Sequence, residues 1–286
     1  MTRVAQTEGI LIVPAQDTSK KDTALEKLYG DHFYKYHMDA SLRSALKYAD
    51  LLSPLCKPDS VVDVGCGRGT WLKAFKEKGA SKLVGYDGRW NSQENMIDQS
   101  IVFHGVDLNE PICISNSERY DLAMSLEVAE HLEPSSAQDF IRSLTTLSDV
   151  VLFSAAYTKQ GGTNHINEQP HTYWAKVFSR FDYVPYDLFR PIVWGDKEIP
   201  FWYQQNTFLY VRKNTPVSSL LINAGYNPMQ NISFMDCVHP ILYENHALAK
   251  IILSEIGTKA LLRQLALRTI PKPLRPLAQK VKGLIT

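Results

Sequence analysis

The chain has 286 residues, and its 31 lysines and arginines stand against 30 aspartates and glutamates, giving a formal net charge of +1. This length suits one large domain with extensions or two small domains. Hydrophobic residues make up 44% of the chain and charged residues 21%, as is usual for a globular protein with a sizeable core. The near-neutral charge argues against a protein held on nucleic acid mainly by neutralising phosphates.

The cysteines and apolar runs indicate a cytoplasmic protein. Cys56, Cys66, Cys113 and Cys237 form no C-x-x-C pair, and this usage fits a reducing compartment better than a disulfide scaffold or a zinc site. No apolar run approaches the ~18 residues of a membrane span, and the run at 10–13 is too short for a secretory signal. We therefore expect no stable membrane insertion. Whether the protein forms a homodimer stays open.

The chain divides into four predicted parts. Residues 1–30 show no sustained hydrophobic period and are expected to form a flexible arm. Residues 31–57 place apolar side chains at helical spacing, which predicts a helical lid. Residues 58–215 alternate strands and helices, and residues 216–286 predict a helical extension. After Glu255 this extension has basic but no acidic residues. The basic tail is either solvated or packed on the main domain, or it is a surface for anionic lipid or a partner.

The middle part predicts an α/β sheet. Apolar runs predict strands at 60–64, 82–86, 101–104, 121–125, 150–155 and 207–212. Helical spacing predicts helices at 70–78, 91–98, 135–147 and 172–180. This alternation is typical of a doubly wound parallel sheet covered by helices on both faces.

The strongest motif follows the first predicted strand. Asp63 precedes alternate glycines at 65, 67 and 69, and a predicted helix comes next. Glycines let the backbone approach a ligand closely, and the start of a helix offers free N–H groups. About twenty residues later, Asp87 and Gly88 end the second strand, where a carboxylate can accept both hydroxyls of a ribose. The pair of features predicts a cofactor that contains a nucleoside.

The motif distinguishes between two classes of cofactor. A dinucleotide fingerprint would need glycine at position 70, which is Thr70. The D-x-G-x-G-x-G pattern instead resembles motif I of the class I S-adenosylmethionine-dependent methyltransferases. The likeness covers about 58–212 and continues in YDLAMSLEVAEHL (120–132) and VVLFSAA (150–156). It implies a seven-stranded, mostly parallel Rossmann-like sheet with S-adenosylmethionine as the cofactor.

The resemblance also implies which residues surround the cofactor. They lie at the ends of four strands: Asp63, Gly65, Cys66 and Gly67 at the methionine part, Asp87 and Gly88 at the ribose, Asp107 and Leu108 at the adenine, and Leu126 and Glu127 beside the sulfonium. For Asp107 an ordinary turn residue is the alternative, and nothing in the sequence indicates a reactive thiol at Cys66.

Glu127, Glu130 and His131 would share one face of a helix. His131 lies one residue off the E-x-x-H spacing of di-iron bundles, so the sequence does not favour a metal here. The resemblance places His131 near the sulfonium, as a general base or as a residue that shapes the pocket. Capping and solvation of the helix is the alternative.

The loop 160–171 is the second candidate site. It opens with two glycines, is otherwise polar, and leaves the sheet at the carboxyl ends of the strands, where doubly wound folds bind ligands. We expect His165 to act as the base and Glu168 to orient it or to bind an acceptor hydroxyl. A metal held by His165, Glu168 and His171, or a plain surface loop, is the alternative, and we expect catalysis to need no divalent metal. The H-x-N-E-Q pattern is similar to a subset of small-molecule and glycan-modifying methyltransferases.

The aromatic residues that follow allow two interpretations. Tyr173, Trp174, Trp194 and the run 201–203 belong either to the core or to a wall for a sugar ring or flat polar acceptor.

Together these features predict methyl transfer from S-adenosylmethionine to a hydroxyl, or an amine, of a small molecule such as a sugar or natural product. The alternatives are an RNA or protein methyltransferase and a non-catalytic homologue that keeps the cofactor site. DNA is disfavoured, because 125–128 carries Ser-Leu-Glu-Val where amine-methylating DNA enzymes of this class have an N/D-P-P-Y-type tetrad.

Overall fold

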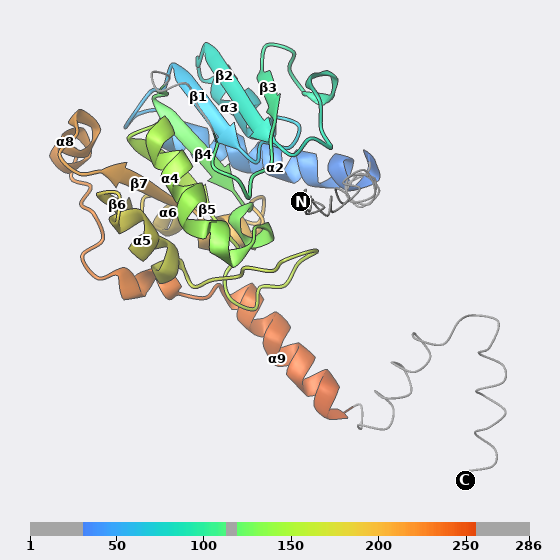
Figure 1. Cartoon of the computed structure of the whole chain (residues 1–286). Helices are drawn as coiled ribbons and strands as arrows, with labels where there is room; N and C mark the ends of the chain where they lie inside the picture. The colour runs from blue at the N-terminus through green and yellow to red at the C-terminus, as the bar shows by residue number, and fades with distance from the viewer. Residues whose placement is uncertain (1–30, 113–118, 256–286) are drawn as a thin grey trace, which may run out of the picture. The chain divides into compact units, whose positions relative to one another are not determined.

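The computed structural model describes residues 31–112 and 119–255 (Figure 1). The arm expected at 1–30 and the basic tail after Glu255 lie outside the described residues. The chain forms two compact units, one ending at Asp236 and the other beginning at Cys237. The division expected at residue 215 stays a prediction.

The first unit is built on a seven-stranded sheet in the order β3-β2-β1-β4-β5-β7-β6. The strands are β1 (Ser60–Val64), β2 (Lys82–Asp87), β3 (Val102–Gly105), β4 (Leu122–Leu126), β5 (Val150–Ser154), β6 (Tyr183–Tyr186) and β7 (Phe208–Arg212). β7 runs antiparallel to both of its neighbours, and the other pairings are parallel. The predicted mostly parallel, seven-stranded sheet is confirmed.

Helices cover both faces of this sheet. They are α2 (Asp31–Leu52), α3 (Thr70–Glu77), α4 (Ala137–Leu147), α5 (His171–Ser179), α6 (Arg190–Val193), α7 (Phe201–Asn206) and α8 (Pro216–Asn223). Single 3-10 turns lie at η1 (Gln93–Asn95), η2 (Ala129–His131), η3 (Pro134–Ser136) and η4 (Ile232–Asp236). In the second unit the structure describes α9 (Pro240–Glu255). None of the described helices is long and apolar enough to cross a membrane.

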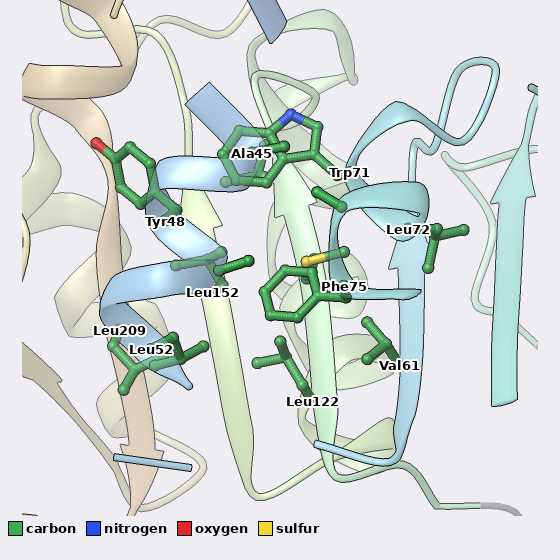
Figure 2. Close-up of a cluster of buried hydrophobic side chains, with 14 of the residues drawn as sticks. Ala45, Tyr48, Leu52, Val61, Trp71, Leu72, Phe75, Leu122, Leu152 and Leu209 are labelled. Atoms are coloured by element: carbon green, nitrogen blue, oxygen red, sulfur yellow. The ribbon is translucent and has the colours of Figure 1, made fainter. Parts of the chain in front are cut away.

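Two hydrophobic cores form because successive side chains of a strand point to opposite faces of the sheet. Val61 and Leu122 join the core under α2 and α3, whereas their neighbours Val62 and Ala123 join the core under α4 and α5. Figure 2 shows the first core, in which residues of α2 and α3 lie over residues of β1, β4, β5 and β7. β1, β4 and β5 are therefore buried on both faces, as their nearly continuous apolar sequences predict, whereas β3 at the edge of the sheet is largely exposed.

The α2 helix forms part of this first core. Ala45, Tyr48 and Leu52 are fully buried (Figure 2), and the Tyr48 hydroxyl donates a hydrogen bond to the carbonyl oxygen of Tyr203 at 2.7 Å. The end of α2 is thereby fixed to the segment before β7. A role of this helix as a lid stays a prediction.

The sheet order reverses between β1 and β4. β1 pairs with β2 on one side and with β4 on the other, although β2 and β3 separate β1 from β4 along the chain. Ligands of doubly wound folds bind at such a switch point, beyond the carboxyl ends of the strands. Asp63 and Glu127, at the ends of β1 and β4, therefore flank the expected binding edge.

Candidate functional site

The glycine turn after β1 packs tightly against the segment that follows β4. Gly65 has φ 90, and a Cβ atom there would lie 2.3 Å from Cγ2 of Val128. The N–H groups of Gly65 and Cys66 donate to the carbonyl oxygen of Tyr86 at 2.7 and 3.1 Å. Burial raises the pKa of the Cys66 thiol well above its usual value, which keeps it protonated. The turn is thus fixed to β2, and position 65 accommodates only glycine without a shift.

Asp87, at the end of β2, is held at both of its carboxylate oxygens. Oδ2 accepts the N–H of Gly67, and Oδ1 accepts the N–H of Gly88, both at 2.6 Å. The Asn91 side chain donates to the carbonyl oxygen of Gly67 at 2.5 Å and ties the glycine turn to the same region. Burial raises the pKa of Asp87 to about 6, although the two backbone N–H groups oppose the shift. The carboxylate is therefore fixed in place beside the glycine turn.

Asp63 adds a second buried acid at the end of β1. Its side chain is 3% exposed, and burial, followed by repulsion from Asp87, raises its pKa to about 8. A buried carboxylate is stabilised by a positive group placed nearby. The edge formed by Asp63 and Asp87 is therefore suited to a ligand that carries positive charge.

The segment after β3 is more exposed than the two acids. Asp107 is exposed, and its Oδ1 accepts the N–H of Asn109 at 3.0 Å, which forms a local turn. Leu108 is half-buried against the second core. Their roles toward an adenine stay predictions.

Glu127 lies immediately after β4 in a strained backbone conformation. Its φ is 56, in the left-handed region that side chains other than glycine rarely adopt. Asn206 Nδ2 donates to both carboxylate oxygens, at 3.1 and 3.2 Å, and Gln160 Nε2 donates to Oε2 at 3.3 Å. Burial raises the pKa of this carboxyl group. Asn206 and Gln160 hold the Glu127 side chain in one orientation, and the sequence assigned neither of them this role.

Glu127, Glu130 and His131 do not share one face of a helix, contrary to the expectation from the sequence. Residues 129–131 form one 3-10 turn, η2, and α4 begins only at Ala137. The chain must turn sharply between β4 and Pro134, where η3 begins, so no regular helix can form there. Glu127 lies before this turn and is directed by Asn206 rather than by a helix.

Glu130 is fully buried within this turn. Its exposed fraction is 0%, and neither carboxylate oxygen has a hydrogen-bond partner of regular geometry among the described residues. Burial and then repulsion from Glu127 raise its pKa well above the usual value. The backbone N–H groups of Glu130 itself and of Ala156 oppose this shift. A buried carboxyl group without a well-aligned donor is still costly and points to a missing proton, water or ligand.

His131 lies beside a second histidine from a distant part of the chain. The ring centres of His131 and His165 are 4.8 Å apart, with the rings nearly perpendicular at 85°. The backbone N–H groups of Ile166 and Asn167 donate to the carbonyl oxygen of Glu130 at 2.9 and 3.0 Å. These bonds hold the loop 160–171 against η2 and bring the two rings together.

The two histidines have different partners. His165 Nδ1 lies 2.8 Å from Oε1 of Glu168, and the same oxygen accepts the N–H of Gly161 at 2.7 Å. His131 Nδ1 is buried with no partner among the described residues. Burial, followed by repulsion from His165, lowers the pKa of His131 to about 4, so this ring is neutral at pH 7.

The third histidine of the loop is not part of this arrangement. His171 is 2% exposed, and its ring nitrogens lie 2.8 Å from the carbonyl oxygen of Met235 and 3.1 Å from Asn206 Oδ1. Burial lowers its pKa to about 4. The set of His165, Glu168 and His171 considered from the sequence is therefore not assembled as a metal site. The structure instead brings a ligand atom each of Glu130, His131 and His165 within 4.8 Å of one another.

The aromatic residues between 173 and 203 differ in how deeply they are buried. Trp174 is buried in the second core, whereas Trp194 is 37% exposed. The half-buried Tyr203 on α7 has its ring centre 5.3 Å from that of Trp71 on α3. An aromatic wall for an acceptor stays a prediction.

Comparison with known proteins gives one family match and one curated relative. Residues 34–160 match the model of a methyltransferase domain. A mitochondrial ubiquinone biosynthesis O-methyltransferase of Dictyostelium discoideum is 29% identical over 100 residues, which are 30% of this chain and 31% of that protein. The chain thus matches about a third of the length of this relative.

Solved structures with the same kind of domain are more distant. The methyltransferase domain of a bacterial Hen1 protein has a TM-score of 0.46 and 20% identity, and the match covers 60% of this chain and 98% of that one. Magnesium protoporphyrin IX methyltransferase from Synechocystis PCC 6803, with bound S-adenosylmethionine, has a TM-score of 0.47 and 17% identity over 71% and 100% of the chains. Similarity at this level says nothing about the acceptor of this chain.

The sheet order, the glycine turn and the acid after β2 agree with the family match. Residues 34–160 therefore match a methyltransferase domain in sequence and have the sheet order expected of one, and S-adenosylmethionine is the cofactor that this match supports.

Proposed function

We propose that this protein transfers the methyl group of S-adenosylmethionine to a hydroxyl group of a small molecule, such as a sugar or natural product. The observation that carries the proposal is the pairing of His131 with His165, the latter oriented by Glu168, beside Glu127. This arrangement lies on segments that leave the same edge of the sheet as the glycine turn. An amine acceptor is the closest variant of this function.

The proposal assigns the cofactor to the ends of four strands. Asp87, with Gly88 beside it, would bind the ribose, since that carboxylate is fixed by backbone hydrogen bonds from Gly67 and Gly88. The remaining contacts follow the family pattern: Asp63, Gly65, Cys66 and Gly67 at the methionine part, Asp107 and Leu108 at the adenine, and Leu126 and Glu127 beside the sulfonium.

The reaction is a displacement at the methyl carbon. The acceptor oxygen forms a bond to the methyl carbon, the bond from carbon to sulfur breaks, and its electron pair neutralises the sulfonium. Alignment of the two reactants supplies ~7–11 kcal/mol of the barrier reduction in such steps. The hydroxyl proton leaves to solvent by way of His131 and His165, and Glu168 keeps the His165 ring in position. Positioned proton transfer contributes a further factor of ~100 to 10,000.

A small acceptor is supported by features of the chain rather than by any one relative. The net charge of +1 offers no general attraction to a polyanion. The matching curated relative is an O-methyltransferase. Gln160 and Asn206 place polar groups beside Glu127, as a hydroxylated acceptor would require.

The test is a methyl-transfer assay with labelled S-adenosylmethionine. We expect label in small-molecule fractions of a cell extract and in a panel of sugars and phenols, and none in RNA or protein. Replacing His165 with alanine should lower turnover ~100-fold, with cofactor affinity almost unchanged, because the residue acts on the acceptor side. His246→Ala, on the exposed face of α9, is the matched control and should keep wild-type turnover.

Two outcomes would contradict this function. Label in RNA or protein would assign the macromolecular alternative. Tight cofactor binding without transfer to any acceptor fraction would identify a non-catalytic homologue.

A further inference from the structure

Glu130, His131 and His165 form a compact group of possible metal ligands, which we call the Glu130 cluster. One ligand atom from each residue lies within 4.8 Å of the other two. Two imidazoles and one carboxylate are a ligand set typical of zinc and of divalent iron sites. Two of the three residues come from η2 and the third from the loop 160–171, so the set exists only in the folded protein.

The second observation is the state of the buried polar atoms. Glu130 is fully buried, and both of its carboxylate oxygens lack a hydrogen-bond partner of regular geometry among the described residues. The Nδ1 atom of His131 is likewise buried without a partner in the described part of the chain. The backbone N–H groups of Glu130 itself and of Ala156 interact with the Glu130 carboxyl group, but neither gives it a well-aligned donor. Native proteins rarely leave buried polar atoms so poorly satisfied, and these atoms belong to two members of one cluster. A cation between them would satisfy both residues at once.

The third observation is the support behind the histidines. Histidine ligands usually give their second ring nitrogen to a carboxylate or a carbonyl group, which fixes the tautomer and leaves the first nitrogen for the metal. His165 Nδ1 pairs with Glu168 at 2.8 Å, and the ring of His131 is hydrogen-bonded to the backbone of Asn164. Each histidine therefore has the outer partner of a metal ligand.

Glycine at position 162 leaves room beside the His165 ring. A Cβ atom there would lie 2.3 Å from Nε2, the ring nitrogen that Glu168 does not engage. The same Cβ atom would lie 2.3 Å from Cε1, so any side chain at 162 would displace the edge of the ring that carries Nε2. Glycine at 162 therefore allows the His165 ring to keep its position in the cluster.

We propose that Glu130, His131 and His165 bind one divalent transition-metal ion. The mixed nitrogen and oxygen ligands favour ions such as Mn²⁺ or Zn²⁺ over Mg²⁺ or Ca²⁺, which prefer oxygen alone. In the proposed function, on which this role rests, an ion here would hold the acceptor hydroxyl and lower its pKa. As ligands, His131 and His165 would then take no proton themselves, and the hydroxyl would lose its proton directly to solvent before methyl transfer. This departs from the expectation that no metal is needed, which considered only residues close together in sequence.

The experiment measures metal binding without cofactor or acceptor. The full-length protein is stripped with a chelator, dialysed against Mn²⁺, and the bound ion is counted by electron paramagnetic resonance and by elemental analysis, with Zn²⁺ as a competitor. We expect one ion per chain, competition by Zn²⁺, and a rise in Tm on loading, since a ligand of the folded state stabilises it.

Matched variants locate the ion. Glu130→Gln and His165→Gln should each weaken Mn²⁺ binding ten-fold or more, in line with the loss expected when a metal ligand or its support is removed. Their far-ultraviolet circular dichroism should match that of the wild type. His246→Gln removes an imidazole elsewhere and should bind Mn²⁺ as the wild type does.

Two results would overturn the proposal. One is the absence of saturable binding of either ion, and the other is binding that both Glu130→Gln and His165→Gln retain in folded form. Because neither S-adenosylmethionine nor an acceptor is present, a failure here leaves the proposed methyl transfer untouched.

Discussion

Asp87 shows how single residues are organised at this site before any ligand is bound. Two backbone N–H groups, from Gly67 and Gly88, occupy one oxygen each of its carboxylate at 2.6 Å. Every carboxylate oxygen has further lone pairs, so both remain able to accept from a ribose. The glycine turn thus orients the acid, and the acid in turn fixes the glycine turn.

Replacing Asp87 with asparagine tests this arrangement. The amide nitrogen would face a backbone N–H in place of an oxygen, leaving a buried donor unsatisfied and one hydroxyl of the ribose without its acceptor. Since a hydrogen bond to a charged group contributes ~1.5–3 kcal/mol, we expect the affinity for S-adenosylmethionine to fall ten-fold or more by calorimetry. Asp139→Asn, which removes an exposed ion pair with Arg142, should bind the cofactor normally. Equal affinities would show that the ribose lies elsewhere.

Some of the residues that the structure brings together at the binding edge can be read from the sequence, and others cannot. The glycine turn and Asp87 are readable because a short local pattern creates them. Asn206 could not be found in this way, because its contact with Glu127 joins residues 79 positions apart. The same holds for the rings of His131 and His165, which meet only because backbone bonds tie two segments together.

At the scale of elements, the loop 160–171 behaves as a fixed part of the site. Ile166 and Asn167 donate to the carbonyl oxygen of Glu130, and the buried Asn167 side chain donates to the carbonyl oxygen of Ala129 at 3.2 Å. These bonds to η2 therefore fix the position of the loop, and a substitution within the loop should displace the histidine rings.

A pair of glycine substitutions measures that coupling. In Gly162→Ala the new Cβ would stand 2.3 Å from the His165 ring, so the ring must move, whereas in Gly105→Ala the nearest atoms lie at 3.5 Å. Displacement of a reacting group by ~1 Å can cost ~100-fold in rate, so Gly162→Ala should lower turnover by about that factor. Its cofactor affinity should stay at the wild-type value.

The glycine control keeps the comparison specific. Gly105→Ala should retain near wild-type turnover, because neither Gly105 nor Gly162 has the positive φ that would add backbone strain. Normal turnover in Gly162→Ala would mean that the position of His165 is irrelevant to methyl transfer.

The elements themselves were predictable where apolar runs are long. β1 to β5 and β7 lie within one or two residues of their predicted bounds, since most of them are buried on both faces and therefore have continuous apolar sequences. β6 was not predicted, because it is a four-residue strand that contains Pro185 and, among the described strands, pairs only with β7. The helix expected at 91–98 shrinks to η1, where the Gln93 side chain bonds to the backbone of Ile101 and Phe103. Tertiary contacts of this kind leave no periodic signal.

At the scale of the whole molecule, the binding edge contains several buried acidic side chains, and their burial lowers the stability of the folded protein. Asp63, Asp87, Glu127 and Glu130 all have raised pKa values, and burial is the largest cause for each. The free protein therefore carries groups that would be more easily ionised in the unfolded chain. Positive charge on a bound ligand would offset part of that cost.

Asp63 makes this cost measurable as a pH dependence. Its pKa is about 8 in the folded protein against 3.8 ordinarily, so between those values the folded state binds a proton that the unfolded chain has lost. The free energy of unfolding must then fall as pH rises, by at most ~1.4 kcal/mol per pH unit for one proton. His131 and His171 act in the opposite sense, but only below their ordinary pKa of 6.5.

Between pH 6.5 and pH 8 His131 and His171 no longer contribute, but Glu130, whose pKa is also raised, contributes in the same sense as Asp63. Urea unfolding of the cofactor-free protein across this window should therefore show a loss that is about 1–2 kcal/mol greater for the wild type than for Asp63→Asn. Asp63→Asn cannot ionise and should show a flatter profile, while groups common to both proteins cancel in the difference. If the two profiles run parallel, Asp63 is already ionised in the folded protein, and a positive group of the chain itself must then be compensating it.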